Sequence, residues 1–92
     1  MLYKIETKGI DRIVIAKIDA KLFEAVQKLT GSLPIYLLTD KGKKKIDLSF
    51  ETMQADMPVV KFKIHKTATL EMVESIISIA EETLKERMTK PG

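Results

Sequence analysis

The lysine run from Lys41 to Lys45 is the densest group of potentially functional side chains in this sequence. It reads Lys-Gly-Lys-Lys-Lys and follows Asp40, a residue type that favours turns. Ammonium groups attract phosphate oxygens without distinguishing bases, and each phosphate contact makes binding more salt-dependent. Lysine also protects exposed strands from aggregation, so a purely protective role remains an alternative. Tyr36 is the only aromatic residue near the run, which disfavours sequence-specific recognition of single strands.

The residue types that catalysis or metal binding requires are scarce. The chain has no cysteine, so it can form neither a disulfide nor a thiolate site. His65 is the only histidine, and one chain therefore cannot supply a paired-histidine metal site. A lone histidine beside Lys66 is more often a solvated surface group, and the usual glycine-rich phosphate-binding motifs are missing. We expect a protein that is not an enzyme and that binds no cofactor or metal.

The composition predicts one globular domain spanning residues 1–92. Hydrophobic residues make up 45% of the chain and charged residues 32%, which is typical of soluble proteins. The apolar runs are too short to cross a membrane, and the first residues lack the apolar core of a signal peptide, so we expect a cytoplasmic protein without a membrane partner. The chain lacks Asn and Trp and is rich in Lys and Glu, a composition typical of hyperthermophile proteins.

The longest amphipathic segment runs from Thr67 to Met88 and predicts a helix. Its apolar residues recur at spacings of three and four, as one stripe of a helix requires. They are Leu70, Val73, Ile76, Ile77, Ala80 and Leu84. Thr67 or Thr69 can cap the first turn, and Pro91 prevents the helix from continuing. A helix about 30 Å long needs a sheet on which to pack.

Five stretches predict β-strands, and a second helix is expected from Asp19 to about Gly31. The strands are expected at residues 2–7, 12–18, 35–39, 45–51 and 59–64. The resulting order, β-β-α-β-β-β-α, implies an α+β two-layer sandwich with an antiparallel or mixed sheet and both helices on one face. If the last two strands pair, two carboxylates and the lysine run approach two further lysines. These residues are Asp47, Glu51, Lys61 and Lys63.

Apolar side chains remain for the opposite face of such a sheet. A monomer rarely leaves a contiguous apolar patch of several hundred Å² in water, so we expect a partner subunit to cover them. The predicted interface comprises Ile13, Ile15, Tyr36, Leu38, Met53 and Met57. The two methionines suit an adaptable contact. As an alternative, the N-terminal strand and the methionine-containing loop fold over this face and close the core.

Charge is unevenly distributed along the chain. Residues 1–66 contain 13 basic and 8 acidic residues, a balance of +5, whereas residues 67–92 contain 3 and 5, a balance of −2. A basic half favours nucleic acid, although lysine-rich surfaces are often only solvated. The candidate phosphate-binding residues are Lys43, Lys44, Lys45, Lys61 and Lys63.

The segment from Ile13 to Glu86 resembles the small dimerising subunit of the KEOPS complex, which supports threonylcarbamoyl-adenosine modification of tRNA. The resemblance lies in the strands at 13–18, 45–50 and 59–64, the helix at 20–29, and the Thr-Ala-Thr-Leu entry into the last helix. Where family members carry Arg, Asn and Arg, this chain has Glu71, Ser75 and Ile79, and residues 32–44 form a longer segment. A divergent paralogue therefore fits better than the standard subunit. The resemblance implies a non-catalytic protein that dimerises through its sheet and helps a complex to hold tRNA.

The leading hypothesis is a small archaeal-type binding module that forms a homodimer or a paralogous heterodimer and joins other subunits of an RNA-acting complex. A stand-alone basic protein that binds nucleic acid through charge is an alternative, as is a small regulatory domain with a ligand site beside the loop from Met53 to Met57.

Overall fold

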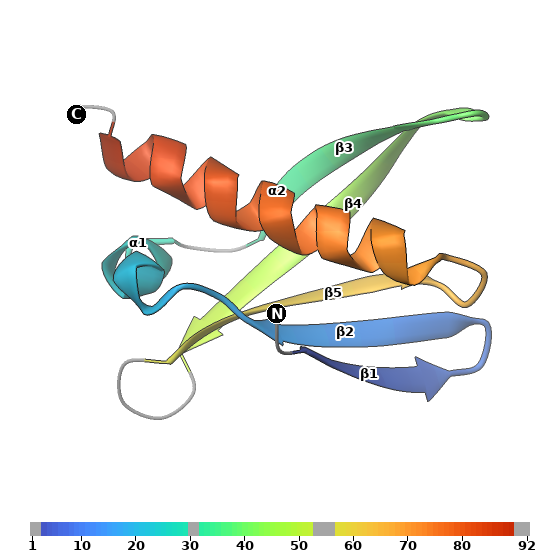
Figure 1. Cartoon of the computed structure of the whole chain (residues 1–92), viewed down its shortest axis with the longest axis horizontal. Coiled ribbons are helices and arrows are strands. Elements are labelled where there is room, and N and C mark those ends of the chain that lie inside the picture. The colour runs from blue at the N-terminus through green and yellow to red at the C-terminus, as the bar shows by residue number, and fades with distance from the viewer. Residues whose placement is uncertain (1–2, 30–31, 53–56, 90–92) are drawn as a thin grey trace.

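A five-stranded sheet is the framework of the protein in a computed structural model, which describes residues 3–29, 32–52 and 57–89. The strands are β1 (Tyr3–Lys8), β2 (Asp11–Lys17), β3 (Leu33–Thr39), β4 (Gly42–Thr52) and β5 (Pro58–His65). They lie in the order β1-β2-β5-β4-β3, and every neighbouring pair is antiparallel (Figure 1). The predicted α+β class and the predicted order of elements along the chain are confirmed.

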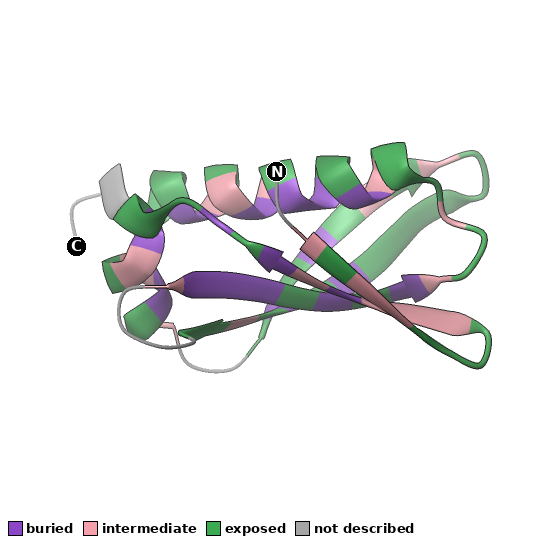
Figure 2. Ribbon diagram, turned by 60° about the horizontal axis from the view of Figure 1, so that its bottom comes forward, coloured by how far each residue is buried: buried purple, intermediate pink, exposed green. Residues whose placement is uncertain are grey.

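The helices cover one face of this sheet. A 3₁₀ turn, η1 (Ala20–Leu22), leads into the short α1 (Phe23–Gln27), and α2 (Leu70–Thr89) follows β5. Figure 2 shows α2 along the sheet with its buried side turned inward and its exposed side outward. Five of the six predicted stripe residues of α2 are buried, whereas Leu70, at the first position of the helix, is 57% exposed.

Local hydrogen bonds show where the helices begin. The Met72 backbone N–H donates to Thr69 Oγ1 at 3.2 Å, so Thr69 rather than Thr67 caps α2. Asp19 Oδ1 accepts from the Lys21 backbone N–H at 2.9 Å and caps η1. The backbone N–H of Asp19 also donates to Glu81 Oε2 at 3.0 Å, which ties the start of η1 to α2.

The core lies between the helices and the sheet and follows the predicted alternation of the strands. Residues pointing to opposite sides of a strand alternate, so each strand contributes every second side chain to the core. The buried strand residues of the cluster are Val14, Ala16, Ile35, Ile46, Leu48, Val60, Phe62 and Ile64, and the helical segments add Leu22, Val26, Val73, Ile76, Ile77, Ala80 and Leu84. No helix of the described residues packs on the opposite face of the sheet.

The sheet opens between β4 and β5. The two strands pair only from Ser49↔Lys61 to Thr52↔Pro58, whereas β3 and β4 stay paired from Leu33↔Leu48 to Thr39↔Gly42. The far half of the β3–β4 hairpin therefore projects away from β5 (Figure 1). We call residues 36–45, which lie beyond the last buried pair of this hairpin, the β3–β4 arm.

Candidate interaction surface

The β3–β4 arm carries two of the large apolar side chains that are exposed in the described part of the chain. Tyr36 is 62% exposed and Leu38 is 84% exposed. In the register of the hairpin, Tyr36 lies opposite Lys45 and Leu38 lies opposite Lys43. Residues opposite each other share a face, and Ile35 and Leu37 take the alternate positions toward the core. The apolar pair and two lysines thus share the face that points away from the helices.

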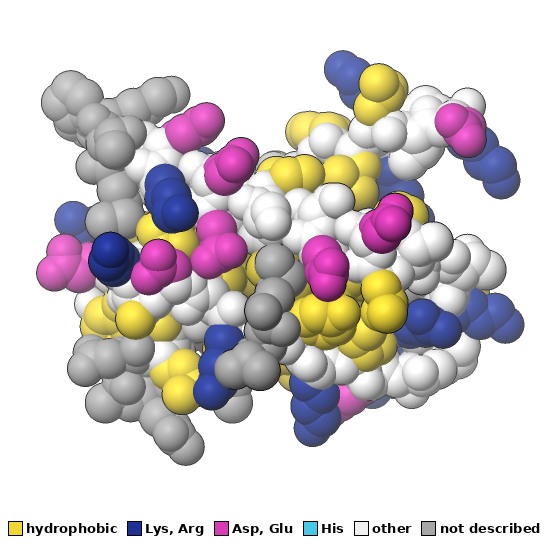
Figure 3. All heavy atoms as spheres, viewed as in Figure 1, with side chains coloured by type: hydrophobic (Ala, Val, Ile, Leu, Met, Phe, Trp, Pro, Cys, Tyr) yellow, Lys and Arg dark blue, Asp and Glu magenta, His cyan; other side chains and the backbone are white. Residues whose placement is uncertain are grey.

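Figure 3 views the molecule from the side of α2 and shows hydrophobic and basic side chains next to one another where the arm projects from the body. The arrangement of the outer face, which is turned away in this view, follows from the register of the hairpin. Direct opposition in an antiparallel pair brings Cβ atoms to about 5 Å, so each lysine stem can lie along the apolar side chain beside it. The arm therefore combines an apolar contact area with positive charge.

The predicted lysine run is divided between two faces. Lys43 and Lys45 lie on the outer face, whereas Lys44 lies opposite Leu37 and points to the helix side. Lys45 Nζ is 3.8 Å from Asp47 Oδ1 in an exposed ion pair. Within the described residues, Lys43 and Lys44 make no ion pair. Lys43 and Lys44 are thus adjacent in the sequence and carry the same charge, but they lie on opposite faces of the hairpin.

Lys61 and Lys63 form a second basic group, on β5. Lys61 pairs with Ile15 and Ser49 across the sheet, and Lys63 pairs with Ile13. Both lie with Asp47 and Glu51 around a shallow hollow of about 270 Å³. Lys63 Nζ is, however, 3.9 Å from Asp11 Oδ2 and forms an ion pair with it. Because β4 leaves β5 before Ser49, Lys43 and Lys44 have no partner on β5, whereas Lys45 approaches this group through Asp47.

Ile13 and Ile15 lie on the same outer face but far from the arm. Both are half-buried in β2, flanked by β1 and β5. Since β5 and β4 lie between β2 and β3, at about 4.8 Å per strand, and β4 diverges from β5 at the arm, the two apolar pairs lie more than about 14 Å apart. Charged residues of β4 and β5 occupy the space between them. The predicted interface residues thus form two separate apolar pairs rather than one patch.

Of the two predicted interface methionines, the structure describes only Met57. Met53 lies outside the described residues. Met57 is half-buried and directly precedes β5, at the end of β4–β5 pairing opposite to the arm. The structure therefore does not bring Met57 together with Tyr36 and Leu38.

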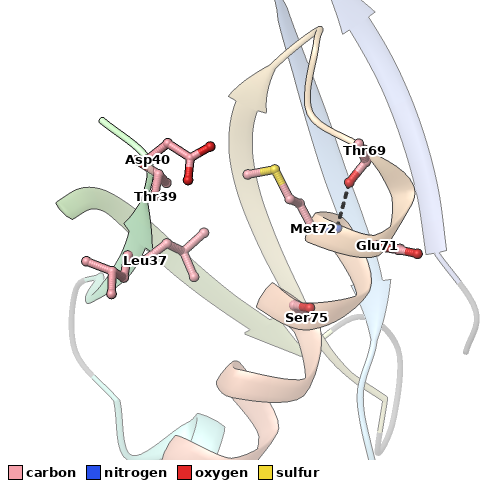
Figure 4. Close-up of a pocket in the computed structure, with 8 residues that line it drawn as sticks. Leu37, Thr39, Asp40, Thr69, Glu71, Met72 and Ser75 are labelled. Atoms are coloured by element: carbon pink, nitrogen blue, oxygen red, sulfur yellow. Dashed lines mark hydrogen bonds between the residues drawn. The ribbon is translucent and has the colours of Figure 1, made fainter. Parts of the chain in front are cut away.

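No sequence pattern predicted the groove that the structure shows between the arm and α2. It has a volume of about 410 Å³ and lies between the end of β3 and the first turns of α2 (Figure 4). Leu37 and Met72 supply apolar surface, and Asp40 and Glu71 supply carboxylates. The lining residues are about thirty positions apart in the sequence, so only the packing of α2 beside β3 brings them together.

His65 holds the turn between β5 and α2. Its Nδ1 accepts from the Thr67 backbone N–H at 3.2 Å and lies 2.7 Å from Thr67 Oγ1. Because a backbone N–H can only donate, Nδ1 is an acceptor and the ring proton lies on Nε2. This arrangement gives His65 a role in local structure.

The interior of the described regions contains only apolar side chains among its buried residues. In the same regions, no three His, Asp or Glu side chains gather as metal ligands. None of the described helices combines the length and apolarity needed to cross a membrane. The candidate site is the outer surface of the arm, where the exposed Tyr36 and Leu38 lie opposite Lys45 and Lys43.

Comparisons of the chain with protein-family models, with curated proteins and with solved structures gave no significant match.

Proposed function

We propose that the chain is a non-catalytic assembly and binding module that works through its β3–β4 arm. In this proposal it acts in the cytoplasm as an accessory subunit of a tRNA-modifying complex. The observation that carries the proposal is the shared outer face of Tyr36, Leu38, Lys43 and Lys45. The class of complex comes only from the sequence resemblance to the KEOPS subunit.

The two kinds of side chain on this face have different tasks. Tyrosine is enriched in protein interfaces because its ring buries a large apolar area while its hydroxyl remains able to bond. Lysines at the edge of such a contact attract phosphate oxygens and remain solvated. An apolar contact with a protein, surrounded by weak phosphate attraction, is the expected combination for a subunit that helps others to hold RNA.

A charge reversal at adjacent positions tests the phosphate part of this proposal. Lys43→Glu changes the outer face, and Lys44→Glu makes the same charge change on the helix side. Both residues are exposed and make no ion pair with any described residue. We expect Lys43→Glu to weaken tRNA binding by the assembled complex more than Lys44→Glu and to reduce the salt slope by about one contact.

The two variants separate the possible results. Equal weakening would mean that net charge, rather than the outer face, governs binding. Unchanged binding in both variants would remove the arm from the RNA-binding surface.

A stand-alone nucleic-acid-binding protein is the second candidate, because Lys43 and Lys45 on the outer face could also bind phosphate without a partner protein. With two phosphate contacts per chain, the expected slope of log K against log salt is only about −1.4 to −1.8. Titration of tRNA with the purified chain alone, at several salt concentrations, distinguishes the candidates. A slope several-fold steeper for the isolated monomer would favour the stand-alone protein.

A further inference from the structure

Strand β3 forms an unprotected edge of the sheet. It pairs with β4 on one side and with no described strand on the other. Its seven residues, Leu33 to Thr39, contain no charged side chain. The opposite edge strand, β1, carries Lys4, Glu6 and Lys8 on its outer face. Charged side chains on an edge prevent other strands from pairing with it, so β1 is guarded and β3 is open.

The backbone of β3 offers hydrogen bonds at Tyr36 and Leu38. Along an edge strand, alternate residues direct both N–H and C=O toward the neighbouring strand, and the others direct them outward. Pro34 has no N–H and therefore fits an outward position. Tyr36 and Leu38 are two and four residues after Pro34, so they take the same orientation in the strand, and their N–H and C=O groups point away from β4. The two residues with the exposed side chains thus also have the unpaired backbone groups.

We propose that β3 pairs antiparallel with β3 of a second copy of this chain, about a two-fold axis at Leu37. Tyr36 then lies opposite Leu38 of the second copy, and the reverse contact is identical. This inference rests on the proposed function and names the partner of the same surface. Three other two-fold registers also place outward groups opposite each other. Two of them set Pro34 opposite Tyr36 or Leu38 and lose a donor at each proline, and the third sets Leu38 opposite itself and leaves Tyr36 opposite Asp40 in the turn. The chosen register pairs both Tyr36 and Leu38 within the strand and uses no proline there.

The charges of the arm are compatible with this pairing. Lys43 and Lys45 lie on β4, one strand behind the new contact. Across the pair, each row on the outer face reads lysine, apolar, apolar, lysine, with about 14 Å between the lysines. This distance exceeds the Debye length of about 8 Å at physiological salt, so their repulsion is largely screened. The apolar residues meet at the centre and the lysines surround them.

The proposed pairing leaves no open edge for a third chain. In the two-fold contact β3 of each copy pairs with β3 of the other, and the two β1 strands, whose edges carry charged residues, form the ends of one continuous sheet. The assembly therefore stops at two chains. It also brings four arm lysines onto one surface, which doubles the number of phosphate contacts available to one RNA.

Cysteine crosslinking tests the register, because the chain has no cysteine of its own. Tyr36→Cys and Leu38→Cys are prepared as separate proteins, mixed under mild oxidation, and compared with each protein alone. Directly opposite Cβ atoms are about 5 Å apart and diagonal ones about 7 Å, and disulfides need about 4 Å. We expect disulfides mainly between the two different variants. Ile10→Cys, 62% exposed like Tyr36 but outside β3, mixed with Leu38→Cys gives the collision background.

A paired site raises the effective concentration to the millimolar range, so at about 10 μM protein the specific crosslink is expected to form roughly 100-fold faster than the background. Rapid crosslinking of Tyr36→Cys with itself would overturn the register. A rate equal to the background in the mixture, with the unmodified chain sedimenting as a monomer, would overturn the pairing.

Leu38→Lys provides a measurement that does not depend on cysteine. It removes two Tyr36–Leu38 contacts per dimer and is expected to raise the dimer dissociation constant by up to about 30-fold. Leu70→Lys, at an exposed site outside β3, is the control and is expected to leave it unchanged. Equal effects of the two variants would contradict the proposal. If pairing fails but Lys43→Glu still weakens tRNA binding more than Lys44→Glu, the inference falls and the proposed function stands.

Discussion

Replacing Leu84 by alanine tests the packing of α2 against the sheet. Leu84 is 0% exposed and belongs to the hydrophobic core, whereas Leu70, on the same apolar stripe of the sequence, is 57% exposed. The two Leu→Ala changes remove the same atoms from the same helix. Any difference between them therefore reports burial rather than helix propensity.

The expected magnitudes differ several-fold. A fully buried leucine replaced by alanine loses about 2.7 to 5 kcal/mol of unfolding free energy, because apolar transfer energy is lost and a cavity remains. A domain of 92 residues has a total of roughly 5 to 14 kcal/mol, so this loss is a large share of its stability. Leu70→Ala is expected to cost below about 1 kcal/mol.

Urea unfolding followed by far-ultraviolet circular dichroism measures both changes. Protein concentration is held constant, since any dimerisation adds to the apparent stability. At about 4 to 8 °C per kcal/mol, Leu84→Ala should also lower the melting temperature by at least about 10 °C. Equal destabilisation by the two variants, with unchanged urea dependence, would show that α2 does not pack as described.

Three further predictions concern hydrogen bonds at the ends of the elements. Thr69→Ala should cost about 1 kcal/mol of unfolding free energy because α2 loses its cap, and Thr69→Ser should retain most of it; equal losses in the two variants would argue against the cap. Glu81→Ala should cost roughly 0.5 to 1.5 kcal/mol because it removes the acceptor at the start of η1, whereas Glu82→Ala, on an exposed neighbour, should be near neutral in the same unfolding assay. Nitrogen-15 NMR of neutral His65 should show the proton on Nε2, and a proton on Nδ1 would contradict its bonds to Thr67.

The local elements could be predicted because their patterns depend on neighbouring residues. Ile46 and Leu48 alternate with Lys45 and Asp47, and the structure buries the first pair and exposes the second. The predicted burial of the apolar stripe on α2 was correct for the same reason, except at Leu70. This residue has the right spacing for burial, but it is the first residue of the helix and is exposed there. The predicted strand over 35–39 was too short: the structure extends it back to Leu33, across a proline that an edge strand can accommodate.

The arrangement of the candidate site depended on pairing between distant segments. Periodicity assigns a side chain to one of two faces of its own strand, but it contains no information on which strands are neighbours or where their pairing ends. The strands β4 and β5 separate beyond Ser49, so Lys43 and Lys44 have no partner on β5, and only Lys45 approaches Lys61, through Asp47.

The amino-acid pattern thus specifies which residues are buried and which segments are strands or helices, since burial follows from local alternation. Only the tertiary structure places Tyr36 and Leu38 beside Lys43 and Lys45 and Ile13 more than about 14 Å away from them. The physical reason is that strand order and sheet divergence result from the packing of the whole sheet against α1 and α2, a balance to which every element contributes.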